Sequence, residues 1–182
     1  MVGFLEKFPK LKGRDFYITG ESYAGHYIPA ISAYLANSDN KDINLKGSAI
    51  GNGWVDPYQQ YPEYNKFSYE NGLIKEWHHY LLNIAYSICQ GLITLTDKVG
   101  LWPVALEECQ LATTTILGNP IAPAFNVYDI RIPCEHPPLC YDLSNTEKFL
   151  ERPEVVKALG VEGRTWTECN QVVHTFMLGD WM

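Results

Sequence analysis

The sequence predicts an α/β protein built on a parallel sheet, and three observations support this class. Residues 15–20 form a short β-prone run that ends at a glycine. Residues 23–36 follow with apolar side chains at helical spacing, and residues 45–53 predict a second, buried strand that closes on a Gly-Asn-Gly turn. A strand, a helix and a strand within about forty residues make a βαβ unit, in which the strands are parallel and the crossover is right-handed.

The remaining segments give weaker predictions. Tyrosines, a tryptophan and two prolines make residues 54–69 too irregular for a sheet core, which indicates a surface excursion. The segments expected to be helical are residues 76–95, as one or two amphipathic helices, residues 145–150 with a capped start, and residues 153–160, closed by Gly160. Residues 105–125 mix β-branched residues with prolines and show no clear period, so they receive no assignment.

Composition excludes several functions. The 182 residues include 14 Lys+Arg and 21 Asp+Glu, so the formal net charge is −7, which argues against a nucleic-acid surface. With 46% hydrophobic and 19% charged residues, the chain has the composition of a globular protein rather than of a disordered one. No apolar run approaches the roughly 20 residues that span a bilayer, so we expect no membrane span.

Ser22 lies at the centre of the sharpest local motif, Gly20-Glu21-Ser22-Tyr23-Ala24-Gly25, between the first strand and the helix. This is the context of a nucleophile elbow, where a strained turn requires small residues two positions before and after the serine. Gly20 and Ala24 satisfy that requirement. Two interpretations of Ser22 stand at this point, a catalytic nucleophile or an ordinary helix-capping serine.

Several motifs together resemble those of the serine carboxypeptidases, a family with the α/β-hydrolase fold. The matching segments, in order, are residues 20–29 (Gly-Glu-Ser-Tyr-Ala-Gly-His-Tyr-Ile-Pro), 50–53 with Asp56-Pro57, 126–131, Cys134 to Cys140-Tyr141, and 179–182 (Gly-Asp-Trp-Met). The resemblance implies a parallel sheet core with a helical lid insertion. It divides the chain into a core with the elbow over residues 1–53, a lid region over residues 54–128, and a return to the core over residues 129–182.

The resemblance also implies catalytic roles. Ser22 would be the acylating nucleophile, and the backbone N–H of Tyr23 would donate to the oxyanion. A protonated Glu21 would donate a hydrogen bond to the C-terminal carboxylate of a peptide, which requires acidic solution or a site that favours the protonated form. Without the resemblance, Glu21 is equally well explained as an exposed acid that complements the helix dipole.

Six aromatic residues would form the substrate-binding walls by the same resemblance. Those around the residue before the scissile bond are Trp54, Tyr61, Tyr64 and Trp181, and those near the departing residue are Tyr128 and Tyr141. Such walls suit apolar side chains, although core or lid packing explains each residue equally well. We interpret His26, one helical turn beyond Ser22, as a structural histidine rather than the catalytic base.

The five cysteines fit the same family. The resemblance pairs Cys134 with Cys140 in a short loop and Cys89 with Cys109 inside the lid, and it gives Cys169 a partner upstream of this chain. The spacing does not match a structural zinc site, and we expect no metal and no organic cofactor. Disulfides imply an oxidising compartment, so we expect the secretory pathway, with a vacuole, a lysosome or the cell exterior as destination.

The resemblance places the Asp and His of the catalytic triad beyond the Trp181-Met182 landmark, and the second oxyanion donor upstream. We therefore expect a central fragment of a serine-type carboxypeptidase that acts on peptide and protein C-termini at acidic pH. The chain alone is expected to be inactive, because Ser22 has no base. The alternative is a truncated, non-catalytic homologue that binds peptides or a partner, or a gene remnant. The oligomeric state is not predicted.

Overall fold

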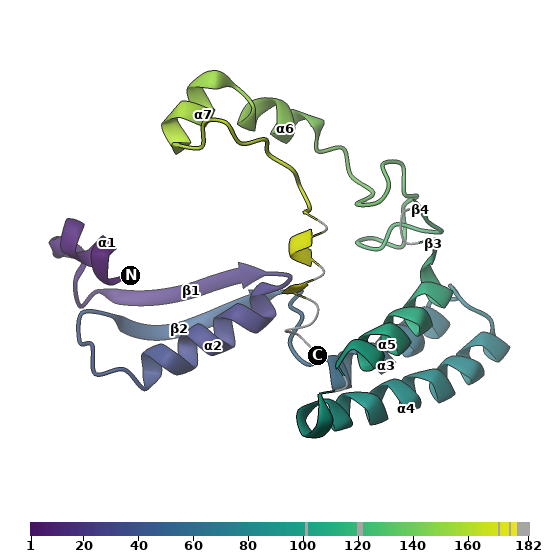
Figure 1. Ribbon diagram of the computed structural model, residues 1–182. Coiled ribbons are helices and arrows are strands. Elements are labelled where there is room, and N and C mark those ends of the chain that lie inside the picture. Colours follow the sequence, from purple (N-terminus) through teal and green to yellow (C-terminus); the bar gives the residue numbers. More distant parts are fainter. Residues whose placement is uncertain (101, 120–121, 171, 175, 178–182) are drawn as a thin grey trace. The chain divides into compact units, whose positions relative to one another are not determined.

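A computed structural model describes residues 1–100, 102–119, 122–170, 172–174 and 176–177 of the chain. The chain forms two compact units, Met1–Gln60 and Tyr61–Met182. The first unit contains α1 (Val2–Lys7), the short 3-10 helix η1 (Pro9–Leu11), β1 (Asp15–Glu21), α2 (Ala24–Ala36) and β2 (Asn44–Gly51), followed by the start of α3 (Pro57–Glu70). Figure 1 labels the helices α1, α2 and α3 and the strands β1 and β2 along the chain.

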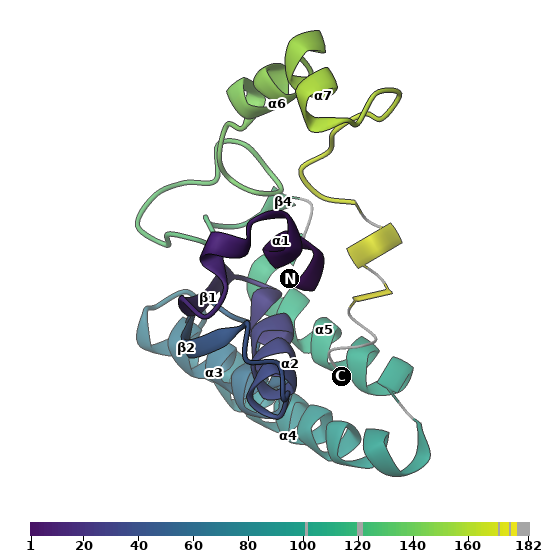
Figure 2. The same cartoon turned by 90° about the vertical axis from the view of Figure 1, so that its left-hand side faces the viewer.

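The predicted βαβ unit is confirmed. β1 and β2 are parallel neighbours, with Asp15 opposite Asn44 at one end and Glu21 opposite Gly51 at the other. α2 connects them and packs along one face of this strand pair, as Figure 2 also shows. Ile28 anchors the helix on the strands and is 3% exposed. Both strands therefore end at the edge where the Ser22 turn leaves β1.

The second strand differs from its prediction in burial. Residues 48–51 of β2 are exposed, although their apolar composition predicts a buried strand. The reason is that the sheet has two strands within the described residues and α2 lies on one of its faces. β1 alternates instead, with exposed residues such as Tyr17 between half-buried residues such as Ile18.

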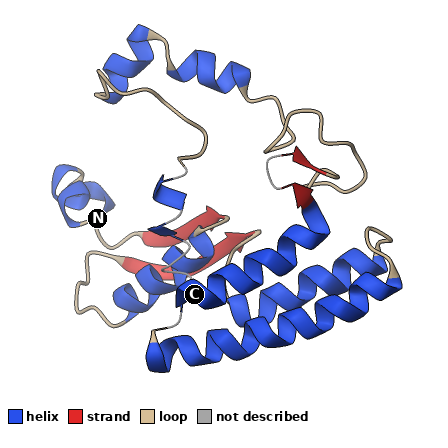
Figure 3. Ribbon diagram, turned by 45° about the vertical axis from the view of Figure 1, so that its right-hand side comes forward, coloured by secondary structure: helices blue, strands red, loops and turns tan. Residues whose placement is uncertain are grey.

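Helices dominate the second unit. It contains the rest of α3, then α4 (Glu76–Val99) and α5 (Trp102–Leu117), which lie side by side in Figure 3. The prediction for residues 76–95 is confirmed as one continuous helix. Leu82, Tyr86 and Cys89 form the buried stripe of α4 and are at most 5% exposed. The opposite face of α4 carries exposed apolar residues, among them Trp77.

Two of these helices depart from the sequence prediction. Residues 57–70 form a helix, α3, rather than an irregular excursion. Residues 102–117 form α5, in a region that received no assignment. The buried positions of α5 are Ala105, Cys109, Ala112 and Ile116, which repeat with helical spacing but are mostly small side chains.

The last elements are short. β3 (Gly118–Asn119) pairs antiparallel with β4 (Ala122–Pro123), and α6 (Ser144–Leu150) precedes α7 (Pro153–Leu159). Gly160 ends α7 in the left-handed conformation, as predicted. The predicted cap of α6 at Asn145 is wrong, because the helix begins one residue earlier with Leu143 at the N-cap position and no side-chain cap. No helix within the described ranges has the length and apolar character needed to cross a membrane.

Candidate active site

Ser22 occupies a strained turn between β1 and α2. Its φ angle is +59°, in the left-handed region that non-glycine residues rarely adopt. β1 ends at Glu21 and α2 begins at Ala24, so the turn places the serine at the carboxyl end of the strand. The side chain is exposed. A strained, exposed serine between a strand and a helix is the geometry of a nucleophile elbow.

Close packing explains why small residues surround this turn. A Cβ atom added at Gly20 would lie 2.6 Å from the Cβ of Ala24 and 3.1 Å from Cδ1 of Ile28. A Cβ added at Gly25 would collide with the backbone of Trp54, 2.7 Å from its carbonyl carbon and from its nitrogen. Positions 20 and 25, on either side of the serine, therefore have no room for a larger side chain.

The loop after β2 lies against the Ser22 turn. The backbone N–H of Ser22 donates to the carbonyl oxygen of Gly51 at 3.2 Å, and the backbone N–H of Trp54 donates to the carbonyl oxygen of Ser22 at 2.9 Å. Between them, Asn52 also has a positive φ, +45°. The N–H and the carbonyl of Ser22 are thus held by the end of β2 and by the loop that follows it.

The first unit brings four of the predicted site residues together. Glu21 and Ser22 are both exposed at the carboxyl edge of the sheet. The ring of Tyr23 makes an edge contact with Trp54, their centroids being 6.4 Å apart. In α/β proteins this edge is where ligands bind. His26 lies one turn along α2, with its ring centroid 5.6 Å from that of Tyr23.

Tyr61 and Tyr64 belong to the second unit, where they form part of a helical core. Tyr61 is 2% exposed, and its hydroxyl accepts a hydrogen bond from Nε2 of Gln110 at 3.2 Å. Its ring contacts Tyr64 and Tyr86, at centroid distances of 5.9 Å and 6.3 Å. Burial raises the pKa of Tyr61 and Tyr64, and it raises that of Tyr86 to about 12. In this arrangement Tyr61 is a packing residue.

Tyr128 and Tyr141 lie against each other, with ring centroids 5.9 Å apart. The disulfide Cys134–Cys140 lies between them in the sequence and folds the chain back, so that residues 13 positions apart become neighbours. Both rings are largely exposed, 63% for Tyr128 and 46% for Tyr141. The structure therefore groups the two residues predicted to lie near the departing residue. Trp181 lies outside the described residues.

Asn126 organises the turn that carries Tyr128, and the sequence prediction missed it. Asn126 is 0% exposed, and its Oδ1 accepts hydrogen bonds from the backbone N–H groups of Tyr128 at 2.9 Å and Asp129 at 3.1 Å. Asp129 in turn pairs with Arg131 at 2.8 Å. Hydrogen bonds from Arg131 lower the pKa of this half-buried carboxyl to about 2. The available signal was the asparagine itself, because an Asn side chain often accepts hydrogen bonds from the backbone N–H groups just after it and so stabilises a turn.

Both predicted disulfides are present. Cys89 and Cys109 join α4 to α5 with a Cα–Cα distance of 5.1 Å, and each is 0% exposed. Cys134 and Cys140 close the short loop beside Tyr141. Cys169 is exposed and has a free thiol, so its predicted upstream partner stays a prediction.

A ring of three polar side chains links α3 to α4, and we call it the Asn65 ring. Nδ2 of Asn65 donates to Oδ1 of Asn83 at 2.9 Å, Asn83 lies 3.3 Å from Nε2 of His79, and Nδ1 of His79 lies 3.2 Å from Oδ1 of Asn65. An imidazole with its proton on Nδ1 satisfies all three contacts. Tyr69 stacks on His79 with ring centroids 4.4 Å apart. Sequence reasoning missed this ring because its members follow no apolar pattern.

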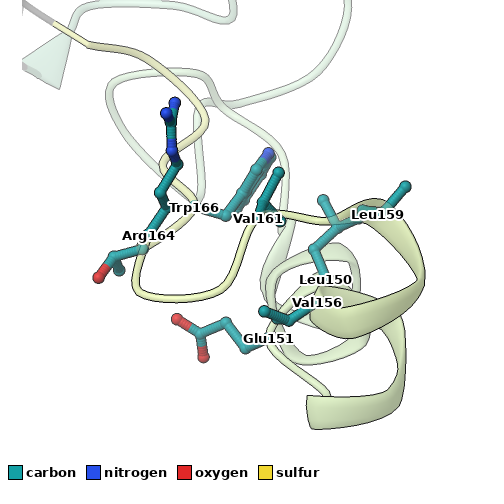
Figure 4. Close-up of a pocket in the computed structure, with 8 residues that line it drawn as sticks. Leu150, Glu151, Val156, Leu159, Val161, Arg164 and Trp166 are labelled. Carbon is teal, nitrogen blue, oxygen red and sulfur yellow. The ribbon is translucent and has the colours of Figure 1, made fainter.

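A hollow of about 530 Å³ lies in the segment that contains α6 and α7. Figure 4 shows its lining, which is mostly apolar and includes Trp166, with Glu151 and Arg164 as charged members. None of the predicted site residues that the structure describes lines it. No group of three or more His, Cys, Asp or Glu side chains that could hold a metal ion occurs within the described part of the chain.

A parallel βαβ unit with a left-handed serine between strand and helix defines an α/β-hydrolase-type nucleophile turn. Comparison with known proteins gives the family. The profile of the family described as serine carboxypeptidase matches residues 1–182, so the chain belongs to that family. A crystal structure of Kex1Δp, a prohormone-processing carboxypeptidase from Saccharomyces cerevisiae, superposes with a TM-score of 0.75 at 29% identity, over 98% of this chain and 41% of that one. The α/β-hydrolase fold class is thereby confirmed.

Curated relatives agree. Serine carboxypeptidase-like 49 of Arabidopsis thaliana is 43% identical over 100% of this chain, which spans 36% of that relative. A serine carboxypeptidase-like protein of Oryza sativa subsp. japonica is 42% identical over 100% of this chain, which spans 43% of it. Carboxypeptidase Y homolog A of Talaromyces stipitatus is 35% identical over 98% of this chain and 34% of its own length. The chain thus spans well under half the length of these relatives.

Proposed function

We propose that the protein containing this chain is a serine-type carboxypeptidase that releases C-terminal residues through an acyl-enzyme on Ser22. One observation carries the proposal. In a chain of this family, the motif serine is exposed, has a φ of +59°, and lies at the carboxyl edge of a parallel strand pair. Neither a capping role nor a packing role accounts for a serine held in a strained backbone conformation.

In the proposed reaction, Oγ of Ser22 attacks the carbonyl carbon of the last peptide bond. The serine proton passes to a base, and the base returns it to the departing amine as the C–N bond breaks. Water then adds to the acyl-enzyme and releases the shortened peptide. The backbone N–H of Tyr23, at the start of α2, is the proposed donor to the developing oxyanion.

Glu21 is the proposed contact for the substrate carboxylate. It is the residue before Ser22, and it is exposed at the same edge of the sheet. An ionised Glu21 would repel the substrate carboxylate, whereas a protonated one would donate a hydrogen bond to it. The preference for acidic pH then follows from the chemistry of two carboxyl groups sharing one proton. Trp54 lies beside the elbow and is the proposed wall for the residue before the scissile bond.

The finer assignments of the other aromatic residues follow the same proposal. Tyr128 and Tyr141 contact each other, and together they offer an apolar wall for the departing residue. Tyr64 and Trp181 are proposed for the other subsite. For Tyr61, burial favours a supporting role in packing. The buried disulfide between Cys89 and Cys109 supports an oxidising compartment on the secretory pathway.

The function is tested with the full-length protein and blocked peptides that carry an apolar penultimate residue. The wild type is expected to release the C-terminal residue at acidic pH, and Ser22→Ala is expected to lower kcat by roughly 10⁴-fold or more. Equal activity of the two proteins would remove Ser22 from the mechanism. An inactive wild type that still binds peptides would favour the alternative function, a non-catalytic binding module. The chain of 182 residues, tested alone, is expected to be inactive.

The role of Glu21 is tested by two substitutions measured across pH. Glu21→Ala is expected to lose the low-pH preference for peptides over esters. Glu21→Gln keeps a hydrogen-bond donor at every pH, so its peptidase activity is expected to persist toward neutral pH. A pH profile that neither substitution changes would exclude Glu21 from carboxylate recognition.

A further inference from the structure

Asn52 shares with Ser22 an unusual backbone conformation, and the two residues lie next to each other. Their φ angles are +45° and +59°. Glu21 and Gly51 are partners in the parallel strand pair, so Ser22 and Asn52 directly follow partnered residues at the same edge. Left-handed non-glycine residues cost free energy and persist only where the surroundings hold them. Two of them side by side at a strand edge indicate a constraint that involves both.

The hydrogen bonds at this edge identify the constraint. In a regular parallel ladder, a residue donates to the residue before its partner and accepts from the residue after its partner. Ser22 follows the first half of this rule, because its N–H donates to Gly51 at 3.2 Å. It departs from the second half, because its carbonyl accepts from Trp54 at 2.9 Å, one residue later than residue 53.

One extra residue has therefore been fitted between the two hydrogen bonds, as in a β-bulge. The left-handed turn at Asn52 accommodates it. An extended residue at this position would continue the strand and present the N–H of residue 53, not that of Trp54, to the serine carbonyl. The same turn brings the backbone of Trp54 so close to α2 that Gly25 has no room for a Cβ.

We propose that Asn52 is a positioning residue for the nucleophile, acting through its left-handed backbone conformation, which lets the loop after β2 hold Ser22 by two hydrogen bonds. This inference rests on the proposed function of Ser22. Asn is the residue type that, after glycine, adopts this conformation at least cost. Its side chain is exposed, so packing does not require it.

The contributions of the Asn52 backbone conformation and of its side chain can be tested separately. If the backbone conformation matters, glycine can replace Asn52 without loss, because glycine adopts positive φ freely. A β-branched residue cannot, and it should push the loop toward an extended path that withdraws the Trp54 N–H from Ser22. Because the same loop carries Trp54, the proposed wall for the residue before the scissile bond, its displacement should lower kcat and raise KM together, and Asn52→Gly should keep both at their wild-type values.

The test uses the full-length protein and compares Asn52→Gly, Asn52→Ala and Asn52→Val. We expect Asn52→Val to lower kcat about tenfold, which corresponds to about 1.4 kcal/mol, and to raise KM. Asn52→Gly is expected to keep kcat within about twofold of the wild type, and Asn52→Ala to fall between them. Asn71→Val is the matched control, since Asn71 also precedes a glycine but lies outside the elbow.

Each outcome has a defined meaning. Equal kcat for Asn52→Val and the wild type would overturn the proposal, as would an Asn52→Gly protein as impaired as Asn52→Val, because the amide side chain would then be responsible. Should Asn52→Val fail to fold, the ratio of kcat between Asn52→Gly and Asn52→Ala decides the same question. The wild type and Ser22→Ala are measured alongside, so that failure of the proposed function itself appears as an inactive wild type.

Discussion

The contact between Gly25 and Trp54 allows a prediction in which one substitution has opposite effects at two helical positions. Gly25 lies in the first turn of α2, and Gly91 lies within α4. A Cβ added at Gly91 would meet no atom within 4 Å, whereas one added at Gly25 would collide with the backbone of Trp54. Gly25→Ala and Gly91→Ala therefore make the same chemical change in different surroundings.

The magnitudes follow from these contacts and from helix propensity. Alanine is favoured over glycine in a helix interior by about 1 kcal/mol, so Gly91→Ala should stabilise α4 by that amount. At Gly25, the new Cβ would lie 2.7 Å from two Trp54 backbone atoms, about 0.8 Å inside an ordinary carbon contact of about 3.5 Å. Overpacking of this kind costs about 1–3 kcal/mol. Because the gain in helix propensity is common to both substitutions, the effects of the two variants on helix stability should differ by about this overpacking cost.

The measurement is amide hydrogen exchange on the full-length protein, which gives local opening free energies for α2 and α4 separately. Gly25→Ala should also lower kcat, since a shift of about 0.8 Å would take the 2.9 Å hydrogen bond from Trp54 to Ser22 out of range. The reasoning is refuted if Gly25→Ala protects α2 as strongly as Gly91→Ala protects α4.

Further predictions concern the disulfides and the Asp129 turn. Replacing both cysteines of the pair Cys89–Cys109 by alanine should cost about 3 kcal/mol of stability, because the disulfide closes a loop with a separation of 20 residues. The same change at Cys134–Cys140, with a separation of six, should cost about 2 kcal/mol. Hydrogen exchange of the flanking segments measures both losses of stability, and a larger loss at the short loop would contradict the chain-entropy estimate. For Asp129, the folded pKa of about 2 lies below the ordinary aspartate value of 3.8, so the stabilisation of its turn is present above pH 3.8 and is lost as the pH falls through about 2. Arg131→Gln should move the carboxyl titration, followed by NMR, back toward 3.8, and an unmoved titration would exclude Arg131 as the cause.

The sequence predicted the first unit well because its pattern is made of strong signals. β-prone residues, a glycine and a helical repeat of apolar residues mark β1, α2 and β2 within one or two residues of their observed ends. β2 ends at Gly51, where the predicted Gly-Asn-Gly turn begins. The composition of this segment predicts the turn but not the left-handed conformation of Asn52 within it.

The helical unit was harder to predict because its buried positions are not the usual apolar ones. In α3, the buried positions include Tyr61, Asn65 and Ser68, two of them polar. In α5, Ala105 and Cys109 occupy core positions, and such small side chains give a weak hydrophobic repeat. The helical period is present in both segments, but only the structure shows which residues carry it.

The candidate site also contains residues that the sequence predicted and residues that it did not. Ser22 was predictable because a nucleophile elbow constrains several neighbours at once, including the small residues Gly20 and Ala24. The roles proposed for Glu21 and for the aromatic residues came from the resemblance to a family and stay predictions. The sequence predicted Asn52 only as part of a turn. Its proposed role depends on its backbone φ angle, which the residue type alone does not determine.

The Asn65 ring has a consequence for how this part of the chain tolerates sequence change. Asn65 is the buried member of this ring, whereas His79 is half-buried and Asn83 is exposed, so water can replace a hydrogen bond that Asn83 loses. The Nδ2 group of Asn65 also donates to the backbone carbonyl of His79 at 3.1 Å, so it keeps a partner when Asn83 is replaced, but its Oδ1 depends on the His79 ring. An orphaned buried polar group costs about 1–3 kcal/mol. The tolerance of the ring to sequence change is therefore set by Asn65 and His79, and Asn83 is the position that can change alone.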